Sequence, residues 1–383
     1  AATGENGISL TEINEAAADG CLREQEQCFG KMLRVKLKSD DARLNVIHAR
    51  ALYQAHVYGF LKRDGFNPFD ICALLSAEKY VDKQAVKNAI ISLLAEQPER
   101  GEYKNDARGA LYIAFAAVDY ATFAGDYGFF DEFAEYMPRR VGGRKLTVKS
   151  TVAEHCMRAL DANAAQREFV YDKNVRGIFD CKVYSELLRF FADLPNVLPE
   201  RKDRYVALLG KVAATYADEI DKLKRRSLYA LNSLRATFTC ARLLFDAGEY
   251  DKAYNLLRFN NPVCDRGTGE YRQCSFFVEN GQTSDGAVAA ALYYTTATEC
   301  LAGLKLRDGK IGLNPRIGVD APHIRLELNT DDGCANIDVD NTERCGEWRI
   351  RLNRISYSAA NVELNGRGDA DILLYRTGGD GAQ

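Results

Sequence analysis

The sequence predicts a mainly α-helical fold that is followed by a small C-terminal antiparallel β region. Apolar residues recur with a helical period from about residue 9 to about residue 304. From Ala321 onward the pattern changes to short alternating runs, which Asp, Asn and Gly clusters separate. We therefore expect the boundary between the two parts at residues 305–320.

Short polar turns are expected to end the helices. Glycine in Gly125-Asp126, Gly248-Glu249 and Asp308-Gly309 adopts the left-handed conformation that closes a helix. Pro262 in Asn261-Pro262 prevents a further helical turn. The short connections indicate antiparallel neighbours. The expected helices span residues 42–60, 68–79, 82–97, 106–124, 147–164, 182–195, 201–222, 228–247, 250–258 and 286–303.

The strands are expected where apolar and polar residues alternate over four to six positions. These runs span residues 323–328, 348–352, 361–364 and 371–375. Taken together, the patterns divide the chain into four regions. We expect N-terminal linker helices in residues 1–38, a helical ring in 39–310, the β region in 311–377 and a tail in 378–383.

The helices show no fixed repeat of 33 to 47 residues, which argues against a regular solenoid. Residues 245–253 resemble one tetratricopeptide-type turn, but no second copy follows at the right spacing. A closed toroid of alternating inner and outer helices fits the same periodicity. Such a toroid offers one concave face for a ligand.

Composition limits the classes of function. The 383 residues carry a net charge of -3, and their basic and acidic residues are interspersed, so neither nucleic acid nor an anionic membrane is an expected partner. No apolar run reaches the roughly 18 residues of a membrane-spanning helix. The 11 cysteines include no CxxC pair, and we interpret most of them as buried thiols of a cytoplasmic protein. In an exported assembly, the alternative, Cys334 and Cys345 would be placed to form a disulfide.

A polar corner, Arg63-Asp64-Gly65-Phe66-Asn67-Pro68-Phe69-Asp70, lies between two apolar helical segments. A planar guanidinium beside a carboxylate offers the paired donors and acceptors that vicinal sugar hydroxyls need. The alternative is a helix boundary, in which Asp64 caps and Pro68 opens the next helix.

Several stretches, in this order, resemble the inverting glycoside phosphorylases of the cellobiose phosphorylase type. They are Lys38-Ser39-Asp40-Asp41, Arg63-Asp64, Asn105-Asp106, Gly125-Asp126, Glu154-His155, Asn261-Pro262 and Asn314-Pro315-Arg316. The resemblance covers about residues 30–320 and implies an (α/α)6 toroid that acts on β-linked gluco-oligosaccharides. It implies inorganic phosphate as co-substrate and no other cofactor. The family's N-terminal β-sandwich has no counterpart in this chain, so we expect either its loss or one part of a larger assembly or processed product.

The resemblance also locates the candidate catalytic acid. Inverting cleavage needs a protonated carboxylic acid at the leaving oxygen, and the family supplies it from the second aspartate of an Asp-Trp-Asn-Asp motif. Here Tyr171-Asp172-Lys173-Asn174-Val175 stands at that place, so Val175 occupies the position of the acid. Asp172 is the first candidate for the catalytic acid and Asp180 the second. The alternative for both is a helix cap or a solvated acid.

Other polar residues are candidates for contacts with phosphate and sugar. Arg225 and Arg226 are candidates for the phosphate site, and the alternative is a pair of solvated charges beside a helix start. The family's Thr-His position falls at Leu234. The substrate-binding candidates are Arg63, Asp64, Asp106, Glu279 and Asp285. Asp285 has an alternative role as the N-cap of the helix that follows.

Two functions remain open. The first is an active glycoside phosphorylase or hydrolase. The second is a non-catalytic homologue that serves as a glycan-binding or scaffold subunit with a protein partner or as a homo-oligomer. Metal chemistry is not expected, because the four histidines lack the spacing of a metal site. The chain contains no Walker, GxGxxG or GxSxG motif, which argues against nucleotide binding and acyl transfer.

Overall fold

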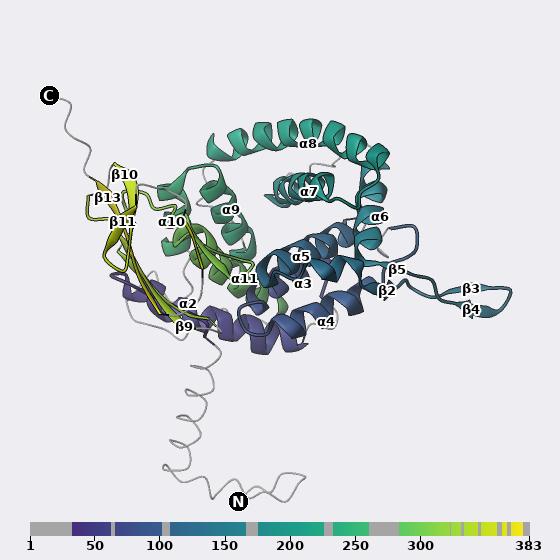
Figure 1. Cartoon of the computed structure of the whole chain (residues 1–383), viewed down its shortest axis with the longest axis horizontal. Helices are drawn as coiled ribbons and strands as arrows, with labels where there is room; N and C mark the ends of the chain where they lie inside the picture. Colours follow the sequence, from purple (N-terminus) through teal and green to yellow (C-terminus); the bar gives the residue numbers. More distant parts are fainter. Residues whose placement is uncertain are drawn as a thin grey trace, which may run out of the picture.

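The computed structural model describes residues 33–62, 66–101, 108–165, 175–225, 233–259, 283–321, 323–330, 333–343, 346–357, 362–365 and 369–377. Over these residues the chain forms a mainly helical part and a mixed sheet that lies at one end of it (Figure 1). The described α-helices are α2 (Ala42–Gln54), α3 (Pro68–Glu78), α4 (Lys83–Leu94), α5 (Gly109–Ala124), α6 (Val152–Ala165), α7 (Val175–Asp193), α8 (Pro199–Arg225), α9 (Leu234–Asp246), α10 (Tyr250–Phe259) and α11 (Thr283–Thr295).

Each of the ten helices expected from the periodicity has a counterpart. The largest difference is at α7, which begins at Val175 instead of residue 182. Four short helical segments lie next to these α-helices. Two π-helices continue α2 and α11, one 3-10 segment follows the π-helix after α2, and another follows α5. These are η2 (Ala55–Gly59), η5 (Thr296–Leu301), η3 (Phe60–Lys62) and η4 (Tyr127–Asp131).

Alternate helices pack against one another in a closed cycle. In the described residues α3 contacts α5, α5 contacts α7, α7 contacts α9, α9 contacts α11, and α11 contacts α3. The intervening helices α2, α4, α6, α8 and α10 pack against members of this cycle. Ten of the eleven residues of α3 are buried, as expected of a helix that is apolar on all sides. The cycle therefore forms the inner layer and the other helices cover it.

The larger sheet has six strands in the order β1-β8-β9-β13-β10-β11. The strands are β1 (Val35–Ser39), β8 (Ile324–Thr330), β9 (Gly333–Asp340), β10 (Glu347–Leu352), β11 (Ile355–Tyr357) and β13 (Ala370–Thr377). The expectation of an antiparallel region is wrong in one respect, because β13 pairs with β9 in parallel. The sheet is therefore mixed. Its inner face packs on the same core as α2, α9, α10 and α11.

Strand β1 lies where the sequence patterns predict linker helices. Val35 and Leu37 are buried, whereas Lys36 and Lys38 point away from the core, which is the alternation of a strand. β1 pairs antiparallel with β8, from Val35 opposite Leu328 to Ser39 opposite Ile324. A segment that precedes all the described helices therefore forms an edge of the C-terminal sheet.

Smaller sheets accompany the helices. Asp308 and Gly309, expected to end a helix, instead form the turn of a hairpin, both with positive φ (56° and 69°). The three-stranded sheet has the order β12-β7-β6, and two-stranded pairs join β2 to β5 and β3 to β4. These strands are β2 (Phe133–Glu135), β3 (Arg139–Val141), β4 (Arg144–Leu146), β5 (Lys149–Thr151), β6 (Leu304–Arg307), β7 (Lys310–Leu313) and β12 (Val362–Asn365).

Of the helices that the structure describes, none combines the length and apolar character that a bilayer crossing requires.

A largely buried set of charged side chains joins the inner helices to η5. Lys79, the C-cap of α3, donates to Asp119 of α5 at 2.8 Å and pairs with Glu299 of η5 at 2.9 Å. Arg242 of α9 pairs with the other oxygen of Glu299, also at 2.9 Å. We call Lys79, Asp119, Arg242 and Glu299 the Glu299 network. Nearby in the sequence, Asp246 at the end of α9 pairs with cations from α7 and from the segment after β7.

Electrostatics hold Glu299 in its ionised form. Burial raises the pKa of the Glu299 carboxyl, but Lys79 and Arg242 outweigh this effect and lower the pKa from 4.5 to about 2. The resulting stabilisation is fully present above pH 4.5, the value for the unfolded chain, and is lost as the pH falls toward 2.

The Glu299→Gln variant tests this contribution. At pH 7 we expect the free energy of unfolding to fall by about 3 kcal/mol, because Lys79 and Arg242 lose their shared carboxylate in a buried site. Between pH 4.5 and 2 we also expect the stability of the variant to depend less on pH than that of the unchanged protein. Urea unfolding at a series of pH values measures both effects.

Glu327→Gln is the matched control. Glu327 accepts from Lys38 at 2.6 Å on the solvent side of the sheet, so we expect a loss below about 1 kcal/mol at pH 7. Equal losses at the two sites would contradict a special role of the Glu299 network.

Candidate functional site

Asp70 is a buried carboxylate in the first turn of α3. Asn67 is the N-cap of this helix, and its side-chain oxygen accepts the backbone N–H of Asp70 at 3.1 Å. The Asn67 amide in turn donates to Asp70 Oδ2. Pro68 occupies the first helical position, where its fixed φ and missing N–H cost nothing. The local sequence thus begins the helix and orients a carboxylate at its start.

Arg235 of α9 meets this carboxylate. Its Nη2 lies 2.7 Å from Asp70 Oδ1, and its guanidinium carbon lies 4.8 Å from the centroid of the Phe69 ring. An arginine that stacks on an aromatic face and pairs with a carboxylate is held in one orientation. Arg235 is the second residue of α9, so the first turns of α3 and α9 lie together.

Phe69 extends the contact to two more helices. Its ring packs edge-to-face against Tyr112 of α5 and Phe179 of α7, each with a centroid separation of 5.3 Å. The residue after Phe179 is Asp180, which is buried and pairs with Arg108, the N-cap residue of α5. A second arginine–aspartate pair therefore joins the N-cap of α5 to the second turn of α7.

We call Phe69, Asp70, Arg108, Asp180 and Arg235 the helix-start cluster. Its charged members come from the N-cap or the first two turns of four helices. The positive end of a helix dipole and its unpaired backbone N–H groups favour carboxylates and other anions. Carboxylates and guanidinium groups are acceptors and donors that suit the hydroxyls of a polyol or an anionic sugar, while the buried Phe69 ring holds Arg235 in place.

The sequence candidates fall on or near the chain that enters these helices. Arg63, Asp64, Asp106, Asp172, Arg226 and Glu279 lie outside the described residues, so their roles stay predictions. In the sequence, Asp64, Asp106 and Asp172 precede the starts of α3, α5 and α7 by four, three and three residues. Asp285 lies in the first turn of α11, but its side chain is outside the described part.

Two candidates, Asp180 and Arg225, have described side chains, and so has Leu234 at the family's histidine position. Asp180 belongs to the helix-start cluster as the partner of Arg108. Arg225 is exposed and ends α8, where a cation complements the helix dipole, and its role toward phosphate stays a prediction. Leu234, which stands at the family's histidine position, begins α9 and packs on the core.

The Glu-His stretch has structural partners. Glu154 in the first turn of α6 pairs with Arg158 at 3.1 Å and Arg201 at 2.9 Å. His155 is buried, its ring stacks on Tyr136 at 3.8 Å, and Gln97 lies 2.7 Å from its Nδ1. Burial lowers the pKa of His155 to about 4. Both residues thus help to pack α6.

Cysteine and metal chemistry find little support in the described part. Five of its six cysteines are buried, and burial raises the thiol pKa to about 12 for Cys72 and about 11 for Cys181. Cys334 is a free thiol, and Cys345 lies outside the described residues. No group of three His, Cys, Asp or Glu side chains in that part is arranged to hold a metal ion.

Sequence reasoning did not select Asp70, Arg108 and Arg235. A usable signal exists for Asp70, because it is the one acidic residue near the start of the otherwise apolar run Pro68-Phe69-Asp70-Ile71-Cys72. Arg108 and Arg235 give no such signal. An arginine near a helix start usually contacts solvent, and only the packing of α3, α5, α7 and α9 reveals the carboxylate partner.

Comparison with known proteins finds similarity only among solved structures. No family model matches the chain, and no curated protein is similar to it in sequence. Among solved structures, it is similar to a protein provisionally described as a kojibiose phosphorylase from the human microbiome, with 12% sequence identity and a TM-score of 0.49. The match covers 99% of this chain and 73% of that protein. We therefore derive the function from the residues of this chain.

A double-mutant cycle on Asp70 and Arg235 tests the first pair. We expect Asp70→Asn and Arg235→Met each to lower the free energy of unfolding by about 3 kcal/mol. Each substitution removes one charge of the ion pair and leaves the opposite charge in a mostly buried site. The double variant should be more stable than the sum of the two losses implies by at least about 1 kcal/mol. Urea unfolding provides the four values.

The same cycle on Glu135 and Lys149 provides the control. This exposed pair has a separation of 3.2 Å, and we expect a coupling below about 1 kcal/mol. A coupling at Asp70 and Arg235 that is no larger would mean that the pair does not join α3 to α9.

Proposed function

We propose that this protein binds β-linked gluco-oligosaccharides at the helix-start cluster of an (α/α)6 toroid. The observation that carries the proposal is the pair of buried aspartates, Asp70 and Asp180, each joined to an arginine from another helix. Such pairs present acceptors and donors in fixed directions, as hydroxyl recognition requires. The closed cycle of inner helices supports the toroid. Five helix pairs lie in the described residues, and the family's fold has six.

Asp180 bears on the choice between catalysis and binding. The ion pair with Arg108 favours the charged form of the Asp180 carboxylate, whereas inverting phosphorolysis or hydrolysis needs an acid with a proton to donate. This pairing favours the glycan-binding alternative as long as Asp180 is the acid in question. An active phosphorylase remains the second candidate, with Asp172 as its acid and Arg225 and Arg226 at the phosphate.

Binding is tested with cellotriose as the β-linked probe and maltotriose as its α-linked counterpart. We expect cellotriose to raise the melting temperature and to bind in calorimetry more tightly than maltotriose. Asp180→Asn should weaken cellotriose binding at least tenfold, because the charge that orients Arg108 is lost. Circular dichroism of the variant checks that it is folded.

Asp161→Asn is the matched control. Asp161 also pairs with an arginine, Arg204, at 3.1 Å, but this pair joins the outer helices α6 and α8. Cellotriose affinity should be unchanged in this variant. Absence of binding to any β-linked gluco-oligosaccharide by the unchanged protein would overturn the proposal.

Incubation with cellotriose and inorganic phosphate separates the two candidate functions. We expect no glucose 1-phosphate from a glycan-binding protein. Release of glucose 1-phosphate that disappears in Asp172→Asn would instead identify a phosphorylase and assign the acid to Asp172.

A further inference from the structure

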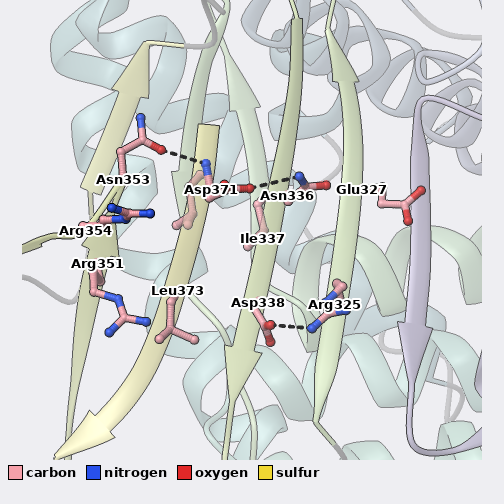
Figure 2. Close-up of a pocket in the computed structure, with 11 residues that line it drawn as sticks. Arg325, Glu327, Asn336, Ile337, Asp338, Arg351, Asn353, Arg354, Asp371 and Leu373 are labelled. Carbon is pink, nitrogen blue, oxygen red and sulfur yellow. Dashed lines mark hydrogen bonds and ion pairs between the residues drawn. The ribbon is translucent and has the colours of Figure 1, made fainter. Parts of the chain in front are cut away.

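The solvent face of the six-stranded sheet contains a polar groove that the proposed sugar site does not use. The groove has a volume of about 680 Å³, within the range of ligand pockets in proteins. Its lining comes from β8, β9, β13, β10 and the β10–β11 turn (Figure 2). Figure 2 shows side chains of Arg325, Asn336, Asp338, Asp371, Leu373 and Arg351 along neighbouring strands, and they belong to the exposed face of the sheet, whereas Ile337 and Ile372 are buried beneath it.

The strand register arranges the lining in two rows. One row runs Arg325, Asp338, Leu373 and Arg351 across four adjacent strands. The next row, two residues further along the strands, includes Asn336 and Asp371. Since adjacent strands lie roughly 4.8 Å apart, each row spans up to about 14 Å. That length fits a short oligosaccharide better than a single sugar unit.

The acidic residues of the groove already have donors. Asp338 accepts from Arg325 at 2.8 Å and also pairs with His323. Asp371 accepts from the Asn336 amide at 3.0 Å. These groups leave further acceptor lone pairs and amide hydrogens toward the groove, which suit hydroxyl groups.

Arg351 and Arg354, at the side of the groove formed by β10, differ from the paired acidic residues. In the part of the chain that the structure describes, neither Arg351 nor Arg354 forms an ion pair, and both are exposed. In Figure 2 both lie at the side of the groove formed by β10 and its turn, opposite Arg325 and Glu327. A carboxylate of a bound ligand would find two planar donors there.

The backbone conformation of the β10–β11 turn indicates that the Arg354 side chain has a role other than forming the turn. Asn353 and Arg354 both have positive φ, 45° and 75°. Asparagine tolerates this conformation, but the second position of such a turn normally carries glycine, and arginine there is strained by about 1 kcal/mol. Asn353 also fixes the turn to β13, since its side-chain oxygen accepts the Asp371 N–H at 2.9 Å. The turn therefore holds an arginine at a strained position where glycine would be more stable, and Asn353 anchors this turn to β13.

We propose that this groove binds an acidic oligosaccharide, with a uronate carboxylate at Arg351 and Arg354 and the sugar hydroxyls along Asn336, Asp338 and Asp371. Charge complementarity favours this occupant over a neutral glycan. Of the apolar residues in the lining, Ile337 and Ile372 are buried and Leu373 alone is partly exposed, which offers little to the apolar side chains that anchor a peptide. The groove lies on the sheet, and the inference is independent of sugar binding at the helix-start cluster.

Calorimetry with α-1,4-linked trigalacturonate tests the proposal on the full chain. We expect measurable binding, and at least tenfold weaker binding by both Arg351→Gln and Arg354→Gln. Arg354→Gly should weaken binding equally while its melting temperature stays the same or rises, because glycine relieves the positive φ. This opposite movement of affinity and stability separates loss of a ligand contact from loss of folding.

Arg349→Gln is the matched control. Arg349 lies on the same strand and the same face, two residues from Arg351 and outside the groove, so its replacement should leave affinity unchanged. Maltotriose reports binding that needs no carboxylate, and acetate reports binding to a free carboxylate. Absence of trigalacturonate binding, equal binding of maltotriose or acetate, or equal losses at Arg349 and Arg351 would each overturn the proposal. Asp180→Asn should not affect this binding, so failure of one site leaves the other testable.

Discussion

The ionised carboxylate of Glu299 is the constraint on which the helical part depends. It pairs with Lys79 at the end of α3 and Arg242 of α9, and Lys79 also pairs with Asp119 of α5. A mostly buried charge of this kind is costly unless its partners stay in place. The network therefore penalises any arrangement in which α3, α5, α9 and η5 separate. Its location in a π-helix is typical of segments where an extra residue in the turn reorients a side chain.

The two ends of the inner helices carry different charged pairs. In the C-terminal halves of α3, α5 and α9, charges neutralise one another within the Glu299 network. At their starts, the pairs Asp70–Arg235 and Asp180–Arg108 lie where helix dipoles favour negative charge. The first set stabilises the packing. The second set includes the hydrogen-bonding groups to which we propose that a sugar binds, and Arg108 is the partly exposed member of its pair.

The pattern of apolar residues predicted the helices well, because a 3.6-residue period is a local property of the sequence. It predicted the sheet less well. Strand β9 was not expected, since its run includes Gly333, Cys334 and Ala335, and the parallel pairing of β9 with β13 cannot be read from either strand alone. At the site, Asp180 was selected as an acid, but its partner Arg108 lies 72 residues away and was not. Periodicity describes neighbours within a helix and carries no information about such distant pairs.

The sequence by itself determined that the chain is mainly helical with a C-terminal β region, and it located the helices that the structure describes, because capping residues, turn residues and apolar spacing act over a few residues. Only the tertiary structure decided that Val35–Ser39 joins a C-terminal sheet, that Asp70 and Asp180 each meet an arginine, and that Arg351 and Arg354 border one groove. Burial makes the difference. A charge in solvent needs no particular partner, whereas a charge in the packed interior is stable only beside an opposite charge that the fold brings to it.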